Sequence, residues 1–179
     1  MKLYTQTDKR WNYDIMTGFD DMPIIKEEEA VKRWGHELND YFGRWGCLIT
    51  SLCNIQKYRG VEMTPKNLNT LLRLNEGYKY LKLKDNCPQK QESFAVWDTI
   101  LKLIGARAVK FNVDKKYIEI KNPLKFYIAR IPFNPPKIMS GHYNIILGNN
   151  PIMHFDSDTG EVRDDWQDNK YYSVLEITF

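Results

Sequence analysis

Cys47 is the residue of this sequence whose position best suits nucleophilic chemistry. It follows Gly46 and opens a stretch in which Leu48, Leu52 and Ile55 recur at helical spacing. A cysteine in the first turn of a helix lies near the positive end of the helix dipole, among backbone N–H groups that have no partner within the helix. Both effects favour the thiolate, the form that acts as a nucleophile. The alternative is structural: Cys47 is then a small apolar residue in a core helix.

A nucleophilic cysteine needs a base within hydrogen-bond reach and a group that orients the base. The sequence holds three histidines, of which His142 precedes an apolar stretch, residues 143–147. After a short turn, the next β-like stretch carries Asp156. A hairpin centred near residues 149 and 150 places His142 opposite residue 157, with Asp156 beside it. A carboxylate in that position fixes the imidazole tautomer and stabilises its charged form.

Other interpretations of the histidine and the acid stay open at this point. Asp158 could orient the histidine in place of Asp156, provided that the strand continues that far. Taken singly, His142 could be an edge histidine without a role. Asp156 could equally be a turn residue, since residues 156–160 read Asp-Ser-Asp-Thr-Gly, a turn-rich string. The three residues together favour the catalytic interpretation.

Composition narrows the class of protein. The chain has 179 residues, 42% hydrophobic and 27% charged, which predicts one globular domain and not a disordered chain. Its 26 basic and 23 acidic residues are too balanced for nucleic-acid binding. Three cysteines without a C-x-x-C pair indicate neither a disulfide framework nor a thiolate zinc site, and no metal or cofactor is expected. With no apolar signal segment at residues 1–8 and no run of roughly 20 apolar residues, a cytoplasmic protein without a membrane span is predicted.

Helical patterns occupy the first part of the chain and β-like patterns the second. The helical stretches are residues 25–41, 47–58, 65–76 and 92–104. The β-like stretches are residues 106–113, 125–133, 141–148, 152–156 and 171–179. This order predicts an α+β fold, with an N-terminal helical layer packed on a C-terminal antiparallel sheet.

Five stretches, in this order, give the chain a resemblance to the papain-like cysteine peptidases, and more closely to the bacterial and phage branch similar to the peptidase C39-like family. They read Gln-Thr-Asp-Lys-Arg-Trp from Gln6, Gly-Cys-Leu-Ile-Thr-Ser-Leu from Gly46, Thr-Pro-Lys-Asn-Leu-Asn from Thr64 with Asn-Glu-Gly-Tyr ending at Tyr78, Gly-His-Tyr-Asn-Ile-Ile-Leu-Gly from Gly141, and Asp-Ser-Asp-Thr-Gly from Asp156. The resemblance covers most of the chain and implies a papain-like fold in a single domain, residues 1–179.

The resemblance also implies roles for four residues. Cys47 is then the nucleophile, His142 the base and Asp156 the orienting acid, while the Gln6 side-chain amide forms the oxyanion hole with the Cys47 backbone N–H. The activity implied is thiol-dependent hydrolysis of a peptide or amide bond, in a peptide or a peptidoglycan peptide. Two alternatives stay open: a catalytically idle, phage-associated binding or structural module, and an acyltransferase on the same triad. Family members of phage origin make action in a host cell or on its cell wall a further possibility.

The chain departs from the family pattern in three places. Ser157 stands where relatives have a proline after the acid, and the papain string C-G-[SA]-C-[WY] is absent. A helical segment is inserted at about residues 20–43, between Gln6 and Cys47. An amphipathic helix there could cover the substrate groove or pack on the outside, and the insertion places most doubt on Gln6.

Overall fold

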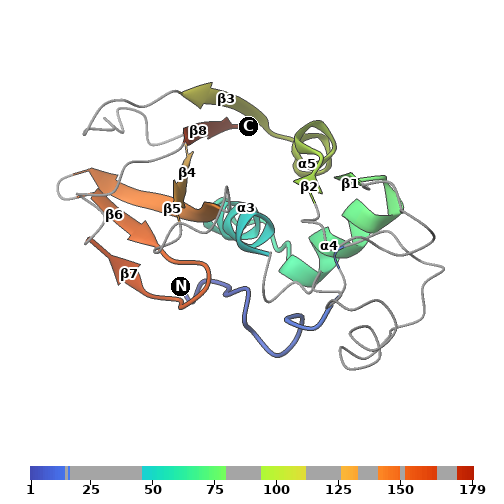
Figure 1. Cartoon of the computed structure of the whole chain (residues 1–179), viewed down its shortest axis with the longest axis horizontal. Helices are drawn as coiled ribbons and strands as arrows, with labels where there is room; N and C mark the ends of the chain where they lie inside the picture. The colour runs from blue at the N-terminus through green and yellow to red at the C-terminus, as the bar shows by residue number, and fades with distance from the viewer. Residues whose placement is uncertain are drawn as a thin grey trace, which may run out of the picture.

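The fold combines three helices with two antiparallel sheets in the part of the chain that the structure describes (Figure 1). This computed structural model describes residues 1–14, 16, 46–79, 94–111, 126–132, 141–149, 152–164 and 173–179. The helices are α3 (Cys47–Tyr58), α4 (Pro65–Leu74) and α5 (Trp97–Ile104). A small sheet pairs β1 (Tyr78–Lys79) with β2 (Phe94–Ala95). The predicted insertion at residues 20–43, with its helix, lies outside the described residues.

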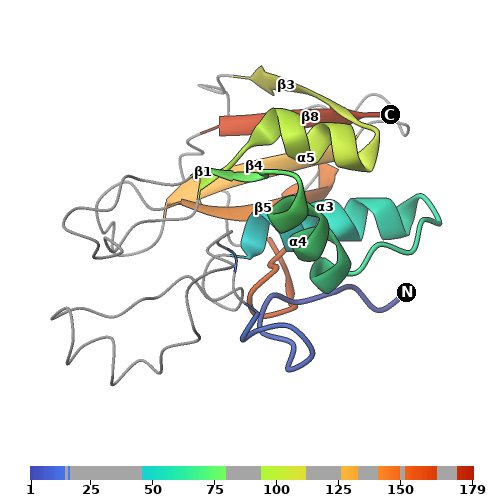
Figure 2. The ribbon, with the colours of Figure 1, turned by 90° about the vertical axis from the view of Figure 1, so that its right-hand side faces the viewer.

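The main sheet has six antiparallel strands, so the α+β prediction is confirmed. The strands are β3 (Arg107–Phe111), β4 (Phe126–Pro132), β5 (Gly141–Asn149), β6 (Ile152–Phe155), β7 (Val162–Arg163) and β8 (Ser173–Thr178). Their order is β3-β8-β4-β5-β6-β7, which puts the C-terminal strand inside the sheet. When the molecule in the view of Figure 1 is seen from its right-hand side, all three helices lie in front of this sheet (Figure 2).

Helix α3 is the centre of the molecule. The sequence predicts one apolar face, but every residue from Cys47 to Gln56 is buried. The helix contacts β5 on one side and α4 on another. Its apolar side chains belong to one core that joins the helices to the sheet, and the fully buried members include Ile49, Leu52, Ile55, Leu68, Leu72, Ile100, Ile128, Ile145 and Ile177.

Buried polar side chains of α3 form hydrogen bonds to the backbone of other segments. Asn54 accepts a hydrogen bond from the backbone N–H of Tyr4 at 2.7 Å and donates one to its carbonyl at 2.9 Å. Gln56 donates to the carbonyl of Ile104 at 2.7 Å. Burial of amide side chains is tolerated because these bonds replace the water that the groups lose. The N-terminal segment is thereby fixed along α3.

The start of α4 is as predicted, but its end differs. Thr64 caps the helix by accepting a hydrogen bond from the backbone N–H of Asn67 at 3.2 Å, and Pro65 takes the first helical position. The helix ends at Leu74, and Glu76, at φ 53°, is the residue that adopts the left-handed conformation. Gly77 serves packing instead, because a Cβ there would lie 2.4 Å from Leu72 Cδ2.

The helix predicted over residues 92–104 is shorter in the structure. Residues 94–95 form β2, and α5 begins at Trp97. Strand β2 pairs with β1, and the Val96 N–H donates to the Gly77 carbonyl at 2.7 Å, so pairing after α4 replaces the first helical turns. The predicted end is correct, since Gly105 adopts φ 67°.

Replacement of Asn54 by Ala should lower the free energy of unfolding by about 2–4 kcal/mol, because it leaves the buried N–H and C=O of Tyr4 without partners. Residues 1–8 should also become sensitive to protease before the protein unfolds. Urea unfolding and timed proteolysis measure the two effects. Asn75→Ala is the matched control: its amide donates to the Leu71 carbonyl at an exposed helix end, so a change of only about 0.5 kcal/mol is expected. Equal losses of unfolding free energy in the two variants would contradict the stabilising role of the Asn54–Tyr4 hydrogen bonds.

Candidate active site

Cys47 occupies the first position of α3, where the sequence analysis predicts it. Gly46, the N-cap residue, provides no side-chain cap, and no acidic residue lies in the first turn. The first helical bond from this end runs from the Thr50 N–H to the Gly46 carbonyl at 2.8 Å. Backbone N–H groups and the positive end of the helix dipole therefore surround the Cys47 position.

His142 lies on β5 and Asp156 directly after β6, and the two strands form the predicted hairpin. The register differs by one residue: Ile145 faces Phe155, where the prediction puts residue 154. Asn149 pairs with Ile152, so the turn is centred one residue later than predicted, and near the turn each residue faces a partner two positions later than predicted. An irregularity between Ile146 and Gly148 then reduces this shift to one position. Asp156 still lies beside the histidine.

The structure brings Cys47, His142 and Asp156 together. His142 Nε2 lies 2.8 Å from Asp156 Oδ1, and both residues are 5% exposed. The Cys47 side chain lies close enough to the His142 ring to raise the pKa of that histidine. Because Asp156 engages Nε2, Nδ1 is the ring nitrogen that can exchange a proton with the thiol. This order, thiol to imidazole to carboxylate, is the arrangement that activates a nucleophile.

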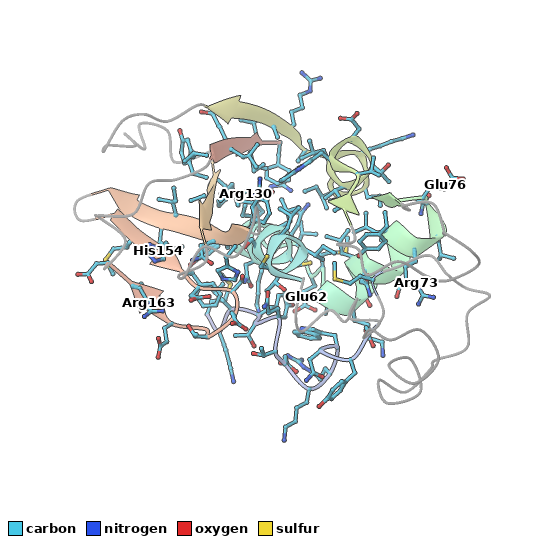
Figure 3. All side chains as sticks on the ribbon, viewed as in Figure 1. Glu62, Arg73, Glu76, Arg130, His154 and Arg163 are labelled. Carbon is cyan, nitrogen blue, oxygen red and sulfur yellow. The ribbon has the colours of Figure 1, made fainter. Side chains whose placement is uncertain are left out.

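Two further groups hold the Asp156 carboxylate. The backbone N–H of Asp158 donates to Oδ1 at 2.9 Å, and the guanidinium of Arg163 lies 3.6 Å from Oδ2. Arg163 belongs to β7, the edge strand beside β6. Figure 3 labels Arg163 and also His154, which belongs to β6. Asp156 thus lies between a histidine ring and an arginine.

Charge on the buried pair is stabilised mutually. Burial alone lowers the pKa of His142, but hydrogen bonds to Asp156 and Cys47, together with the negative charges of both, raise the pKa of His142 to about 10. Burial likewise raises the pKa of Asp156. The hydrogen bonds from His142 and from the Asp158 backbone outweigh that effect and lower the pKa of Asp156 to about 2. At neutral pH the ring is therefore cationic and the carboxylate anionic.

One backbone carbonyl joins the three segments of this site. The Tyr143 carbonyl accepts a hydrogen bond from Ser51 Oγ at 3.1 Å and another from Ser157 Oγ at 3.0 Å. Ser51 lies one helical turn after Cys47, and Ser157 directly follows Asp156. Helix, strand and acid loop (residues 156–160) are therefore held at fixed distances around His142.

Ser51, Ser157 and Arg163 support the site but are not among the residues predicted from the sequence. Ser51 belongs to the stretch that resembles the family motif, which was a usable signal. Ser157 stands where the family pattern has a proline, yet its N–H donates to Asn144 Oδ1 at 3.4 Å and its hydroxyl donates to the Tyr143 carbonyl, bonds that a proline cannot make. Arg163 has no sequence signal, because only the pairing of β7 with β6 brings it to Asp156.

Gln6 and Asp158 meet each other at the edge of the site. Gln6 is buried, and its Nε2 donates to Asp158 Oδ1 at 3.2 Å. The Asp158 side chain therefore binds Gln6, while Asp156 holds the histidine, which decides between the two acids. Although a long segment separates Gln6 from Cys47 in the sequence, Gln6 lies against the loop that carries the acid. Its role in an oxyanion hole remains a prediction.

Cys53 differs from Cys47 although both lie on α3. Both are thiols outside any disulfide. Cys53 is fully buried, and burial raises the pKa of its thiol well above the ordinary value. A thiol of that kind is unreactive. Cys87 lies outside the described residues.

Asp156→Asn should destabilise the protein in a pH-dependent manner. The pKa of His142 is about 10 in the folded protein, against an ordinary value of 6.5 for the unfolded chain. The stabilisation of the fold by the charged ring is therefore complete below about pH 6.5 and is lost as the pH rises to 10. The pKa of Asp156 is about 2 in the folded protein, against an ordinary value of 3.8 for the unfolded chain. The stabilisation of the fold by the carboxylate is therefore present above about pH 3.8 and is lost as the pH falls to 2. The loss of unfolding free energy in the variant should therefore be greatest between about pH 4 and 6.5.

Urea unfolding at a series of pH values measures this loss, and an NMR titration of the His142 ring should show a lower pKa in the variant. Glu62→Gln, which removes an exposed carboxylate near the N-terminal segment, is the control and should show neither effect (Figure 3). A loss that stayed constant from pH 4 to pH 10 would contradict the mutual stabilisation.

Comparison with known proteins adds no family assignment. No protein-family model matches the sequence, and a search of curated proteins finds no significant similarity. None of the described helices is long and apolar enough to cross a membrane. Among the described residues, no group of three histidine, cysteine or acidic side chains is arranged to hold a metal ion. Functional inference therefore starts from the geometry of Cys47, His142 and Asp156.

Proposed function

We propose that this protein is a thiol-dependent hydrolase that cleaves a peptide or amide bond. The single observation that carries the proposal is the buried cluster at the start of a central helix, in which Asp156 binds the ring of His142 and the side chain of Cys47 lies beside that ring. The nucleophile is then Cys47, the general base and acid is His142, and Asp156 orients the ring. No metal or organic cofactor is needed for this reaction.

The reaction follows from the charges of the site. The proton of the Cys47 thiol passes to the His142 ring, whose charged form Asp156 stabilises. The thiolate attacks the substrate carbonyl, and the carbonyl oxygen becomes an oxyanion that the Cys47 backbone N–H and the Gln6 amide stabilise. His142 gives its proton to the leaving amine as the C–N bond breaks, which leaves an acyl-enzyme. The neutral ring then takes a proton from water, and the resulting hydroxide attacks the acyl carbon. The C–S bond breaks, which frees the carboxylic acid and restores the Cys47 thiolate.

The fold is consistent with a papain-like peptidase similar to the C39-like family. A central helix carries the cysteine at its N-terminus, and an antiparallel strand behind it carries the histidine. Chain order is cysteine, histidine, acid, with the oxyanion-hole glutamine first. We extend the proposal to the whole chain, residues 1–179, as one domain of this kind.

The desolvation cost of burying the charged His142–Asp156 pair favours an active site over an idle binding module. A buried ion pair adds little net stability, because the desolvation of both charges offsets their attraction. Strongly shifted pKa values of the kind seen for His142 and Asp156 are typical of catalytic sites. An acyltransferase would share the first half of the reaction, and an amine acceptor in the assay reveals it by its amide product.

Iodoacetamide at pH 7 should label Cys47 faster than Cys53, because Cys47 has the helix N-terminus and His142 beside it whereas Cys53 is enclosed in the core. Peptide mass mapping after timed quenching gives the rate at each cysteine, Cys87 included. His142→Gln should slow the labelling of Cys47 by about tenfold or more, while Cys53 provides the control within the same helix. Equal rates at all three cysteines in the folded protein would refute the proposed nucleophile.

A peptide library with a mass-spectrometric readout tests hydrolysis itself. Cleavage by the wild type, and none by Cys47→Ala, supports the proposal and defines the substrate. A reactive Cys47 that forms no acyl-enzyme with any peptide or activated ester would instead favour the binding module.

A further inference from the structure

We propose that Asp158 is a positioning residue that holds the Gln6 amide for the oxyanion hole. The acid loop, residues 156–160, then sets both halves of the site: Asp156 orients the base, and Asp158 orients the oxyanion donor. This inference rests on the proposed hydrolase function and adds to it a residue to which that function assigns no role.

The Gln6–Asp158 bond restricts the amide in the manner required. Gln6 Nε2 donates to Asp158 Oδ1 at 3.2 Å, and Gln6 is only 4% exposed. An amide nitrogen carries two N–H groups in one plane, so a bond from one of them fixes the direction of the other. A carboxylate is a stronger acceptor than a neutral group, which makes the restriction firm. An oxyanion donor is effective only when it is held in place before the charge develops.

The backbone of the N-terminal segment is bound to the same loop. The Gln6 N–H donates to the Ser157 carbonyl at 2.7 Å, and Thr7 Oγ1 donates to the Asp158 carbonyl at 2.9 Å. Gly160 has φ 79°, and a Cβ at that position would lie 2.8 Å from Thr5 Cγ2. The loop can approach the segment this closely because it has no side chain there.

The loop is also closed upon Asp156. The Asp158 N–H donates to Asp156 Oδ1 at 2.9 Å, and the Gly160 N–H donates to the Asp156 carbonyl at 2.9 Å. Asp158 thus contributes its backbone to the carboxylate that holds His142 and its side chain to Gln6. A side-chain substitution at Asp158 removes only the second contact, which is what makes the proposal testable.

Two probes of Cys47 separate an oxyanion-hole effect from an effect on the thiolate. Acylation by p-nitrophenyl acetate forms the S–C bond, places negative charge on the carbonyl oxygen and releases p-nitrophenolate, so it depends on the oxyanion hole. Alkylation by iodoacetamide displaces iodide at a tetrahedral carbon and develops no oxyanion. The experiment measures both rates for the wild type and for Asp158→Ala, Asp158→Asn and Gln6→Ala.

Gln6→Ala should slow acylation by about 100-fold, the effect of losing one oxyanion donor. Asp158→Ala should slow it by about tenfold, as loss of an orienting partner does, and should leave the alkylation rate of Cys47 within about twofold of the wild-type rate. Asp158→Asn should recover most of the acylation rate, because its amide oxygen still accepts from Gln6. In the Gln6→Ala background, Asp158→Ala should cause no further slowing. Glu62→Gln is the control with unchanged rates.

Asp158→Ala with a wild-type acylation rate would overturn the positioning role, and so would equal slowing of both reactions. A full additional loss in the Gln6→Ala background would do the same. If Asp158→Ala fails to fold in a thermal unfolding measurement, Asp158→Ser carries the same expectation. Wild-type protein that is alkylated at Cys47 but never acylated would contradict the hydrolase function itself, whereas normal wild-type acylation combined with an inert Asp158 would contradict only this inference.

Discussion

The carbonyl oxygen of Tyr143 is the point on which the geometry of the site depends. A carbonyl has two lone pairs, and here Ser51 of α3 and Ser157 of the acid loop each use one. Each of the three segments joined at this oxygen carries Cys47, His142 or Asp156 close by. The distances between thiol, imidazole and carboxylate are therefore set by two serine hydroxyl bonds to one backbone carbonyl, and not by the long-range packing of the fold alone.

Helix α3 can serve as this central element because its buried Ser51, Asn54 and Gln56 side chains form hydrogen bonds to other segments. A helix buried on every side would normally be apolar throughout. Here Asn54 and Gln56 are buried, and they bind the backbone of the N-terminal segment and of α5. Each such bond offsets the desolvation of an amide. The same bonds carry the N-terminal segment, with Gln6, along the helix and toward the acid loop.

The short acid loop links electrostatics to position. Its Asp156 carboxylate lies between the His142 ring and the Arg163 guanidinium and also accepts a backbone N–H. These partners stabilise the carboxylate in spite of its burial, and the carboxylate in turn keeps the imidazolium charged. Because the loop also binds the segment of Gln6, a displacement of the loop would disturb His142 and Gln6 together.

The sequence by itself determined the features that depend on neighbouring residues. The glycine before Cys47, the Thr64-Pro65 start of α4 and the hairpin from His142 to Asp156 are local signals, and the structure contains each of them. Only the tertiary structure decided that β8 lies between β3 and β4, that β7 brings Arg163 to Asp156, and that Asp158 binds Gln6. Contacts of this kind join residues far apart in the chain or depend on strand register. Periodicity and turn signals do not encode them, because they arise only when separate elements pack and pair.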